Sequence, residues 1–224
     1  MQPSDVIQAD FDQLATFSDD GWSHNSHYHA YLLRHLPSPC EESLDIGCGT
    51  GAFARLLAQR SAQVLAVDLS PEMIRVAQER SAGFPNITYQ VADVLAWDFP
   101  AERFDCVASI ATFHHLPMEP MLAAIKAALK PGGVLLILDL YESQGWQERL
   151  NDGLAMPASL TLRWLRSGRL RESDEARQAW AAHGEHDVYP QISQVREICS
   201  AILPGATVKR HLFWRYSLVW RKPR

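Results

Sequence analysis

The residues with the clearest chemical meaning form a glycine-rich segment. Residues 44–51 read Leu-Asp-Ile-Gly-Cys-Gly-Thr-Gly, after a predicted strand and before a predicted helix. Glycine lets the backbone approach a ligand without a Cβ collision and accepts the positive φ that a sharp turn demands. A strand-to-helix loop at the carboxyl edge of a parallel sheet is where such folds bind nucleotides. The segment therefore predicts a ligand-binding loop, the alternative being a tight turn and nothing more.

The spacing of the glycines argues against a dinucleotide. A dinucleotide site has the pattern G-x-G-x-x-G, whereas here the glycines stand at 47, 49 and 51. Asp45 stands just ahead of the loop, where its carboxylate would repel a pyrophosphate and attract an ammonium group. We therefore expect a ligand that carries an ammonium group.

Two more acids follow the next two predicted strands. Asp68 ends an apolar run, in the position where a nucleoside site places a carboxylate for both ribose hydroxyls. Asp93 follows the third strand, where it could read the amino edge of adenine, and Met73 could lie against the purine face. One acid at a strand end is more often a helix cap or turn former. Three such acids behind one glycine loop indicate a nucleoside site.

The elements that would position these residues alternate along the chain. Short β-branched runs separated by helical stretches predict a parallel sheet covered on both faces. Strands are expected at 42–46, 63–67, 87–91, 104–110 and 133–139. Helices are expected at 52–60, 71–82 and 118–129, with a weaker one near 94–98. Ser70 can cap the helix that begins at Pro71, and residues 130–133 are expected to stop the helix before them and turn the chain.

The rest of the chain is expected to elaborate this core as one domain. Residues 1–40 form an N-terminal helical segment, in which four apolar positions share a face: Tyr28, Tyr31, Leu32 and Leu36. Residues 41–140 form the core. Residues 141–203 predict a helical cap with pieces near 146–154, 158–168, 173–183 and 193–202. In the last part, 204–224, strands 207–212 and 216–221 are too close for a crossover helix and must pair antiparallel.

Composition bounds the class of protein. A chain of 224 residues with 47% hydrophobic and 21% charged residues is long enough for one α/β domain and is not collagen-like, disordered or a disulfide scaffold. The four cysteines form no C-x-x-C, which leaves zinc ribbons and redox motifs without a basis. The longest apolar run, Val134–Leu138, is far shorter than the ~20 residues of a membrane helix. No signal peptide is recognisable, so we expect a cytoplasmic protein without a membrane partner.

The motifs together resemble the class I S-adenosylmethionine-dependent methyltransferases. The resemblance covers residues 42–139 and rests on LDIGCGTG, AVDLSPEMI, ADV, FDCVASIATFHHL and LKPGGVLLILD. It implies a Rossmann-like, doubly wound α/β fold with a seven-stranded, mostly parallel sheet whose last strand inserts antiparallel; the helical cap would lie between strands five and six. The His-His after the fourth strand is similar to that of small-molecule enzymes of the ubiquinone and menaquinone methyltransferase kind.

The resemblance also implies S-adenosylmethionine as the cofactor and a role for each residue around it. Gly47 and Gly49 would hold the methionine part, and Asp45 would face its amino group. Asp68 would bind the ribose, and the residues after the second and third strands would bind the adenine. The full set of expected cofactor-binding residues is Asp45, Gly47, Cys48, Gly49, Asp68, Leu69, Met73, Asp93, Val94 and Ile110.

Methyl transfer from a sulfonium needs alignment of nucleophile, methyl carbon and sulfur, and no covalent catalyst. A histidine can act as a base if the acceptor carries a proton. His115 and Tyr28 are the first candidates for lining the acceptor pocket, with His114 beside them. Further candidates are His24, His27, His29, His183, His186 and Tyr189. His24, His27 and His29 are poorly spaced for tetrahedral ligation, so no metal is expected.

The acceptor itself is expected to be a small molecule. After the fourth strand the chain reads Ala-Thr-Phe-His-His, without the Asn or Asp followed by Pro-Pro that is typical of enzymes methylating exocyclic amines of nucleic-acid bases. A net charge of -5 gives no broad basic surface for nucleic acid. Trp180 and other cap tryptophans could cover a flat or apolar acceptor. A tRNA or protein methyltransferase, a non-catalytic S-adenosylmethionine-binding module and an NAD-dependent oxidoreductase stay open as alternatives, and the chain is expected to be a monomer or homodimer.

Overall fold

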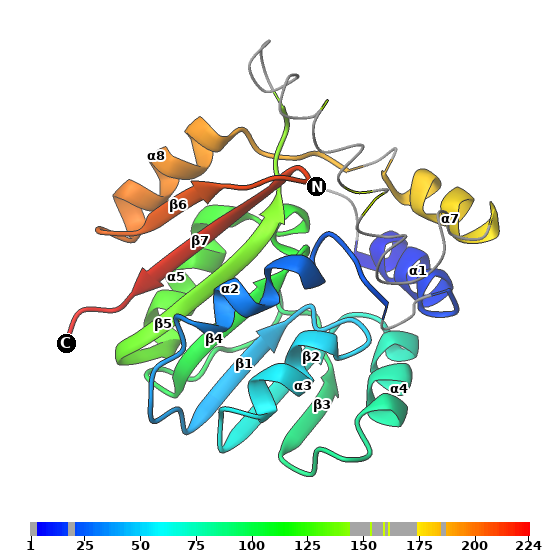
Figure 1. Ribbon diagram of the computed structural model, residues 1–224. Helices are drawn as coiled ribbons and strands as arrows, with labels where there is room; N and C mark the ends of the chain where they lie inside the picture. The colour runs from blue at the N-terminus through cyan, green and yellow to red at the C-terminus, as the bar shows by residue number, and fades with distance from the viewer. Residues whose placement is uncertain are drawn as a thin grey trace.

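The computed structural model of this chain describes residues 4–17, 21–143, 153, 159, 161, 174–184 and 187–224. Its centre is a seven-stranded sheet in the order β3-β2-β1-β4-β5-β7-β6 (Figure 1). The strands are β1 Glu42–Ile46, β2 Gln63–Asp68, β3 Ile87–Val91, β4 Phe104–Ile110, β5 Leu129–Leu140, β6 Thr207–Arg210 and β7 Arg215–Arg221. Strands β1 to β5 pair parallel, and β7 pairs antiparallel with both β5 and β6. The expected fold class, with its antiparallel C-terminal hairpin, is confirmed.

Helices cover both faces of the sheet. They are α1 Ser4–Ala15, α2 His29–Leu33, α3 Ala52–Ala58, α4 Pro71–Arg80, α5 Met118–Ala128, α7 Asp174–Gly184 and α8 Ile192–Ile202, with short 3-10 helices η1 Ser26–Tyr28 and η2 Phe113–His115. Apolar residues of α2 and α3 pack on one face, and those of α5 and α8 pack on the other (Figure 1). Helices α1, α4 and α7 lie together beyond one side of the sheet.

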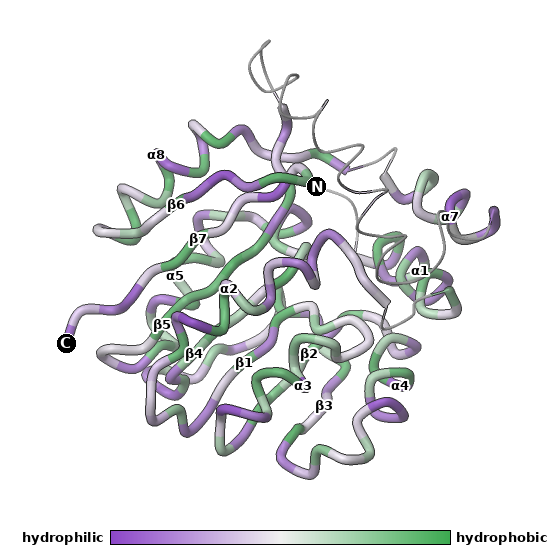
Figure 2. Tube along the Cα trace, viewed as in Figure 1, coloured by the Kyte–Doolittle hydropathy of each residue, from purple (hydrophilic) through white to green (hydrophobic). Residues whose placement is uncertain are grey.

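The central strands are apolar because both of their faces are covered. In β4 and β5 most residues are buried, and the strand traces at the middle of the sheet are predominantly hydrophobic (Figure 2). Burial of such continuous apolar runs is typical of parallel strands. All five parallel strands end at the same edge of the sheet, so the loops that follow β1, β2, β3 and β4 meet there. This edge is where the sequence places its chemistry.

Local signals at two helices act as expected. The Ser70 hydroxyl accepts the Met73 amide at 3.0 Å, and Pro71 begins α4. In the N-terminal segment, Tyr28 and Leu32 are buried in one cluster, against which Tyr31 and Leu36 pack. No helix in the described ranges is long and apolar enough to span a bilayer.

Two local expectations need correction, and a third falls on residues that the structure does not describe. Residues 94–98 form no helix, because the Asp93 carboxylate accepts the Leu95 amide at 2.9 Å in a local turn that competes with helix formation. Residues 130–133 do not turn the chain away: β5 already begins at Leu129, and Gly132 and Gly133 exchange backbone hydrogen bonds with Lys222 beyond β7. The cap helices expected at 146–154 and 158–168 lie outside the described residues, apart from positions 153, 159 and 161.

Candidate active site

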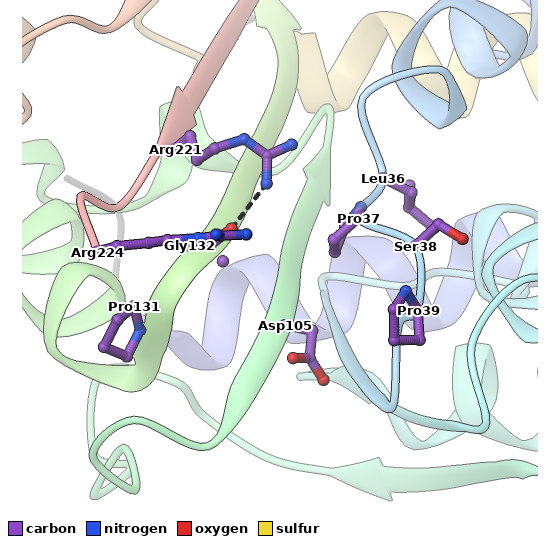
Figure 3. Close-up of a pocket in the computed structure, with 10 residues that line it drawn as sticks. Leu36, Pro37, Ser38, Pro39, Asp105, Pro131, Gly132, Arg221 and Arg224 are labelled. Atoms are coloured by element: carbon purple, nitrogen blue, oxygen red, sulfur yellow. Dashed lines mark hydrogen bonds between the residues drawn. The ribbon is translucent and has the colours of Figure 1, made fainter.

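Two cavities in the described part of the chain were considered as the candidate site. One, of about 400 Å³, lies near the amino ends of β1, β4 and β5, between Pro39, Asp105, Pro131 and Arg224 (Figure 3). The other, of about 530 Å³, lies beyond the carboxyl ends of the parallel strands. Ligands of open α/β sheets bind outside the carboxyl ends of the strands. We therefore take the larger cavity, called the edge cavity below, as the candidate active site.

The edge cavity gathers the residues singled out in the sequence. Its lining includes every residue expected to bind the cofactor, together with His115. The expected cofactor residues in this lining are Asp45, Gly47, Cys48, Gly49, Asp68, Leu69, Met73, Asp93, Val94 and Ile110. They come from four different strand-end loops and from α4. The structure thus brings together residues that are spread over more than sixty positions of the chain.

The glycine loop turns tightly between β1 and α3. Gly47 and Gly49 have φ values of 67° and 52°, a conformation that L side chains rarely adopt. A Cβ on Gly47 would lie 2.2 Å from the Thr112 hydroxyl, so only glycine fits there. A Cβ on Gly49 would meet nothing within 4 Å in the part of the chain that the structure describes. The backbone at Gly49 is therefore left open toward the cavity, as a cradle for a ligand.

Asp68 fastens this loop to the start of α4. One carboxylate oxygen accepts the Gly49 amide at 2.8 Å, and the other accepts the Ser70 amide at 2.9 Å. Burial raises the pKa of Asp68, and the amides that it accepts oppose the shift. Each oxygen keeps a lone pair for a further donor. The carboxylate is thus held in one orientation at the cavity wall.

Asp45 is a buried acid without a matching donor. Its residue is 1% exposed, and neither carboxylate oxygen has a hydrogen-bond partner among the described residues. Burial and the nearby Asp68 carboxylate raise its pKa to about 7; the Ala54 amide, which lies near the carboxylate without the geometry of a hydrogen bond, partly offsets this rise. A buried carboxylate without a partner is costly, so the site favours a ligand that brings positive charge.

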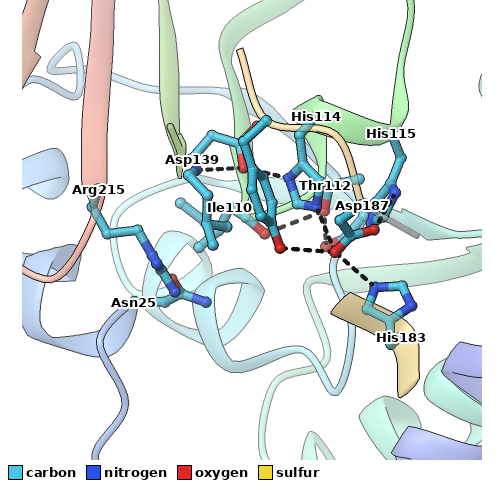
Figure 4. Close-up of polar contacts among 12 residues, drawn as sticks. Asn25, Ile110, Thr112, His114, His115, Asp139, His183, Asp187 and Arg215 are labelled. Carbon is cyan, nitrogen blue, oxygen red and sulfur yellow. Dashed lines mark hydrogen bonds and ion pairs between the residues drawn. The ribbon is translucent and has the colours of Figure 1, made fainter. Parts of the chain in front are cut away.

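The two histidines of η2 differ in their surroundings. His115 lines the edge cavity, and its Nε2 is buried without a partner among the described residues. Burial and the neighbouring His114 lower the pKa of His115 to about 4, so its imidazole is neutral at physiological pH. His114 does not belong to the described cavity lining; its Nδ1 lies 2.7 Å from Asp139 Oδ1 (Figure 4). Burial lowers the pKa of His114, but nearby carboxylates, chiefly that of Asp139, outweigh this effect, so the pKa is raised overall.

The structure places Tyr28 away from the edge cavity. Its hydroxyl donates to the Leu212 carbonyl at 2.9 Å, and its ring lies 4.7 Å from that of His211 at the C-terminal hairpin. Tyr28 is absent from the cavity lining among the described residues. The structure therefore does not bring Tyr28 together with His115, because its hydroxyl is turned toward the hairpin, and its place in an acceptor pocket stays a prediction. His29 of the same segment does line the cavity, and burial lowers its pKa to about 4.

Two features in or beside the site were not predicted from the sequence. Helix α1 lines the cavity with Ile7 and Phe11 among others, and only their helical spacing could have indicated it. Asp187, just after α7, faces both histidines of η2 (Figure 4). In the sequence, Asp187 stands close to His183, His186 and Tyr189, and this proximity is the signal that could have identified it. Of the candidates expected in the cap, Trp180 lines the cavity, while His186 lies outside the described residues.

Comparisons with known proteins agree with this geometry. A family described as a methyltransferase domain matches residues 44–133. An uncharacterised methyltransferase of Mycobacterium tuberculosis is 32% identical over 209 residues, 92% of this chain and 99% of the relative. A demethylmenaquinone methyltransferase of Tropheryma whipplei is 34% identical over 100 residues, 44% of this chain and 41% of the relative.

Among solved structures, the N-methyltransferase NodS from Bradyrhizobium japonicum, in complex with S-adenosyl-L-homocysteine, is similar in fold. It has a TM-score of 0.64 at 20% identity, covering 96% of this chain and 99% of that chain. The sheet order and the strand-edge cavity define a Rossmann-like methyltransferase fold. Together with the full-length relative, they show that this chain belongs to the class I S-adenosylmethionine-dependent methyltransferases.

Proposed function

We propose that this chain transfers a methyl group from S-adenosylmethionine to a small-molecule acceptor in the edge cavity. The observation that carries the proposal is the unpartnered, buried Asp45 carboxylate beside the open backbone of Gly49. A cationic amino-acid moiety satisfies both, because it brings an ammonium group to the acid and needs the space that a Cβ on Gly49 would fill. When bound, S-adenosylmethionine supplies an electrophilic methyl group on its sulfonium.

Different residues of the cavity would bind different parts of the cofactor. Asp45 would bind the ammonium group, and the backbone at Gly47, Cys48 and Gly49 would hold the rest of the methionine part. Asp68, fixed by two backbone amides, would accept the ribose hydroxyls. The adenine would lie among the remaining residues of the set, which are Leu69, Met73, Asp93, Val94 and Ile110.

The acceptor side of the cavity is aromatic and closed by helices that lie off the sheet. Phe11 of α1 and Trp180 of α7 line it, together with His115. Aromatic walls suit a flat or apolar acceptor and keep water from the reaction. Similarity to a demethylmenaquinone methyltransferase supports an acceptor of this kind. The neutral His115 would position the acceptor by a hydrogen bond through Nε2, since a pKa of about 4 makes it a weak base.

The cofactor assignment is tested by binding of S-adenosylhomocysteine to Asp68→Ala. Loss of a carboxylate that accepts two ribose hydroxyls should weaken binding at least ~100-fold in isothermal titration calorimetry. Asp68→Asn keeps one oxygen for the Gly49 or Ser70 amide and guards against simple unfolding of the loop. Asp98→Ala, an exposed acid outside the cavity lining, is the matched control and should bind as the wild type does. Unchanged affinity in both Asp68 variants would contradict the assignment.

The acceptor assignment is tested by a screen for cofactor turnover across phenols, amines, thiols and carboxylates. With the acceptor so identified, His115→Ala should lower kcat about 10-fold or more, because one hydrogen bond that aligns the acceptor is lost. The affinity for S-adenosylhomocysteine should stay within about twofold of the wild type. Loss of turnover and cofactor affinity together would instead make His115 a structural residue.

A further inference from the structure

The carboxylate of Asp187 lies among nitrogens from three histidines (Figure 4). His114 Nε2 and His183 Nε2 lie 3.7 and 3.6 Å from its Oδ2, and His115 Nδ1 lies 3.6 Å from its Oδ1. All four side chains are 8% exposed or less. The group joins η2, the 3-10 helix that follows β4, to α7 and to Asp187 beyond it.

These separations are too long for hydrogen bonds and close to those between ligands of one ion. A hydrogen bond to a carboxylate needs about 2.7–3.2 Å between nitrogen and oxygen. Ligand atoms around a tetrahedral Zn²⁺, with bonds of about 2.0–2.1 Å, lie roughly 3.3 Å apart. One ligand atom each from His114, His115 and Asp187 lies within 4.8 Å of the others. The nitrogen–oxygen separations of 3.6 and 3.7 Å exceed the spacing in a tetrahedral site by only a few tenths of an ångström.

Outer carboxylates orient two of the three imidazoles. His114 Nδ1 lies 2.7 Å from Asp139 Oδ1, and His183 Nδ1 lies 3.1 Å from Asp10 Oδ2. When these Nδ1 atoms carry the protons, the Nε2 lone pairs of both rings face Asp187. A carboxylate behind each metal-binding histidine is the usual outer shell of such sites.

The cluster also holds buried carboxylate oxygens that lack a donor. Asp187 Oδ1 and Asp139 Oδ2 are buried without a hydrogen-bond partner among the described residues. The Tyr189 hydroxyl donates to Asp187 Oδ2 at 2.9 Å and leaves Oδ1 unsatisfied. Anionic oxygen buried beside imidazole nitrogens, without a donor for each oxygen, is a donor set suited to a divalent cation.

We propose that His114, His115 and Asp187 bind a divalent transition-metal ion, with His183 as a further nitrogen ligand. The metal site is inferred from the geometry of this cluster and does not depend on the proposed methyl transfer. It would fasten α7 and its following connection to η2 at the wall of the edge cavity. A metal on His115 Nδ1 leaves the proton on Nε2, which then serves as a fixed hydrogen-bond donor toward the cavity.

The test is Zn²⁺ binding to the untagged, chelator-treated full chain, measured by isothermal titration calorimetry. We expect one Zn²⁺ per chain, and a visible absorption spectrum of tetrahedral Co²⁺ when Co²⁺ replaces it. Asp187→Asn and His183→Ala should each weaken Zn²⁺ binding, the first by about 100-fold or more, since even an outer-shell change costs 10–100-fold. His35→Ala, a histidine outside the cluster, is the matched control and should bind Zn²⁺ as the wild type does.

Binding of S-adenosylhomocysteine to the same samples separates this proposal from the proposed function. Variants that bind it normally are folded, and their loss of Zn²⁺ then supports the metal site. The metal site is wrong if the wild type takes up no stoichiometric Zn²⁺, or if Asp187→Asn binds Zn²⁺ as tightly as the wild type. A chain that binds Zn²⁺ but not S-adenosylhomocysteine would contradict the proposed function and leave the metal site supported.

Discussion

Asp45 shows how one residue can exchange stability for binding. Its folded-state pKa of about 7 lies above the ordinary value of 3.8. Between these two values the folded chain therefore binds more protons than the unfolded chain, and stability falls as the pH rises toward 7. The acid weakens the ligand-free protein at neutral pH, and only a cationic ligand reverses this cost. Asp45 is thus better explained by ligand binding than by folding.

We predict that Asp45→Asn raises the thermal stability of the ligand-free chain and abolishes its preference for a cationic ligand. At pH 8 the Tm should rise by a few degrees, since one kcal/mol corresponds to roughly 2–4 °C in a chain of this size. Near pH 4 the two proteins should melt within about 1–2 °C of each other, because Asp45 is then neutral in the folded state and only partly ionised in the unfolded state. Scanning calorimetry at both pH values measures the difference.

The same substitution bears on cofactor affinity. In the wild type, affinity for S-adenosylhomocysteine should rise with pH through about 7, because binding of its ammonium group requires the ionised carboxylate. In Asp45→Asn this rise should vanish. A variant that keeps the rise would show that another group controls the affinity, and a lower Tm at pH 8 would show that Asp45 stabilises the fold.

At the scale of elements, sequence pattern predicted best where the signal was local. The strands Glu42–Ile46, Ile87–Val91 and Phe104–Ile110 appear with the predicted bounds, because continuous or alternating apolar runs decide them. The start of β5 was missed because Gly132 and Gly133 pair with Lys222, about 90 residues away. Pro and Gly mark a turn only when no distant strand offers them a partner.

In the candidate site too, features set by local sequence could be predicted and features set by distant packing could not. The sequence could predict that the loops expected to bind the cofactor lie together, because each follows its own strand and parallel strands bring their carboxyl ends to one edge. Asp187 was not predictable as a neighbour of His114, since the two are 73 positions apart and meet only through the packing of α7. Tyr28 shows the opposite case: its segment reaches the cavity through His29, while its own hydroxyl is turned toward the hairpin.

Tyr28 leads to a prediction about how the N-terminal segment is joined to the hairpin of β6 and β7. Tyr28→Phe removes the hydrogen bond to the Leu212 carbonyl and keeps the ring packing. We expect a loss of about 0.5–1.5 kcal/mol in the free energy of unfolding, measured by urea denaturation. Turnover should stay within about twofold of the wild type. A large fall in kcat at unchanged stability would instead show that Tyr28 acts in the acceptor pocket.

At the scale of the whole molecule, the edge cavity lies between the carboxyl edge of the sheet and helices that lie beyond this edge. Helix α1 contributes to the cavity wall and packs on α4, where the Asp12 carboxylate accepts the Ser70 hydroxyl and the Glu72 amide. Asp10 contacts His183 of α7. Helix α1 is thus held by these polar contacts and by a small apolar cluster, in which its Leu14 and Ala15 pack with residues of α4. A ligand in the cavity would add a further contact.

We therefore predict that S-adenosylhomocysteine slows hydrogen exchange in α1 more than anywhere on the far face of the sheet. Amides of Ser4–Ala15 should become at least ~10-fold better protected at saturating ligand, because α1 opens locally at low cost and the ligand packs beneath Ile7 and Phe11. Helix α5, Met118–Ala128, packs on the other face and serves as the internal control, with exchange changed less than about twofold. Mass spectrometry of peptic fragments resolves the two helices. Equal protection of both would mean that the ligand stabilises the fold globally, and unchanged exchange in α1 would mean that the helix does not cover the bound cofactor.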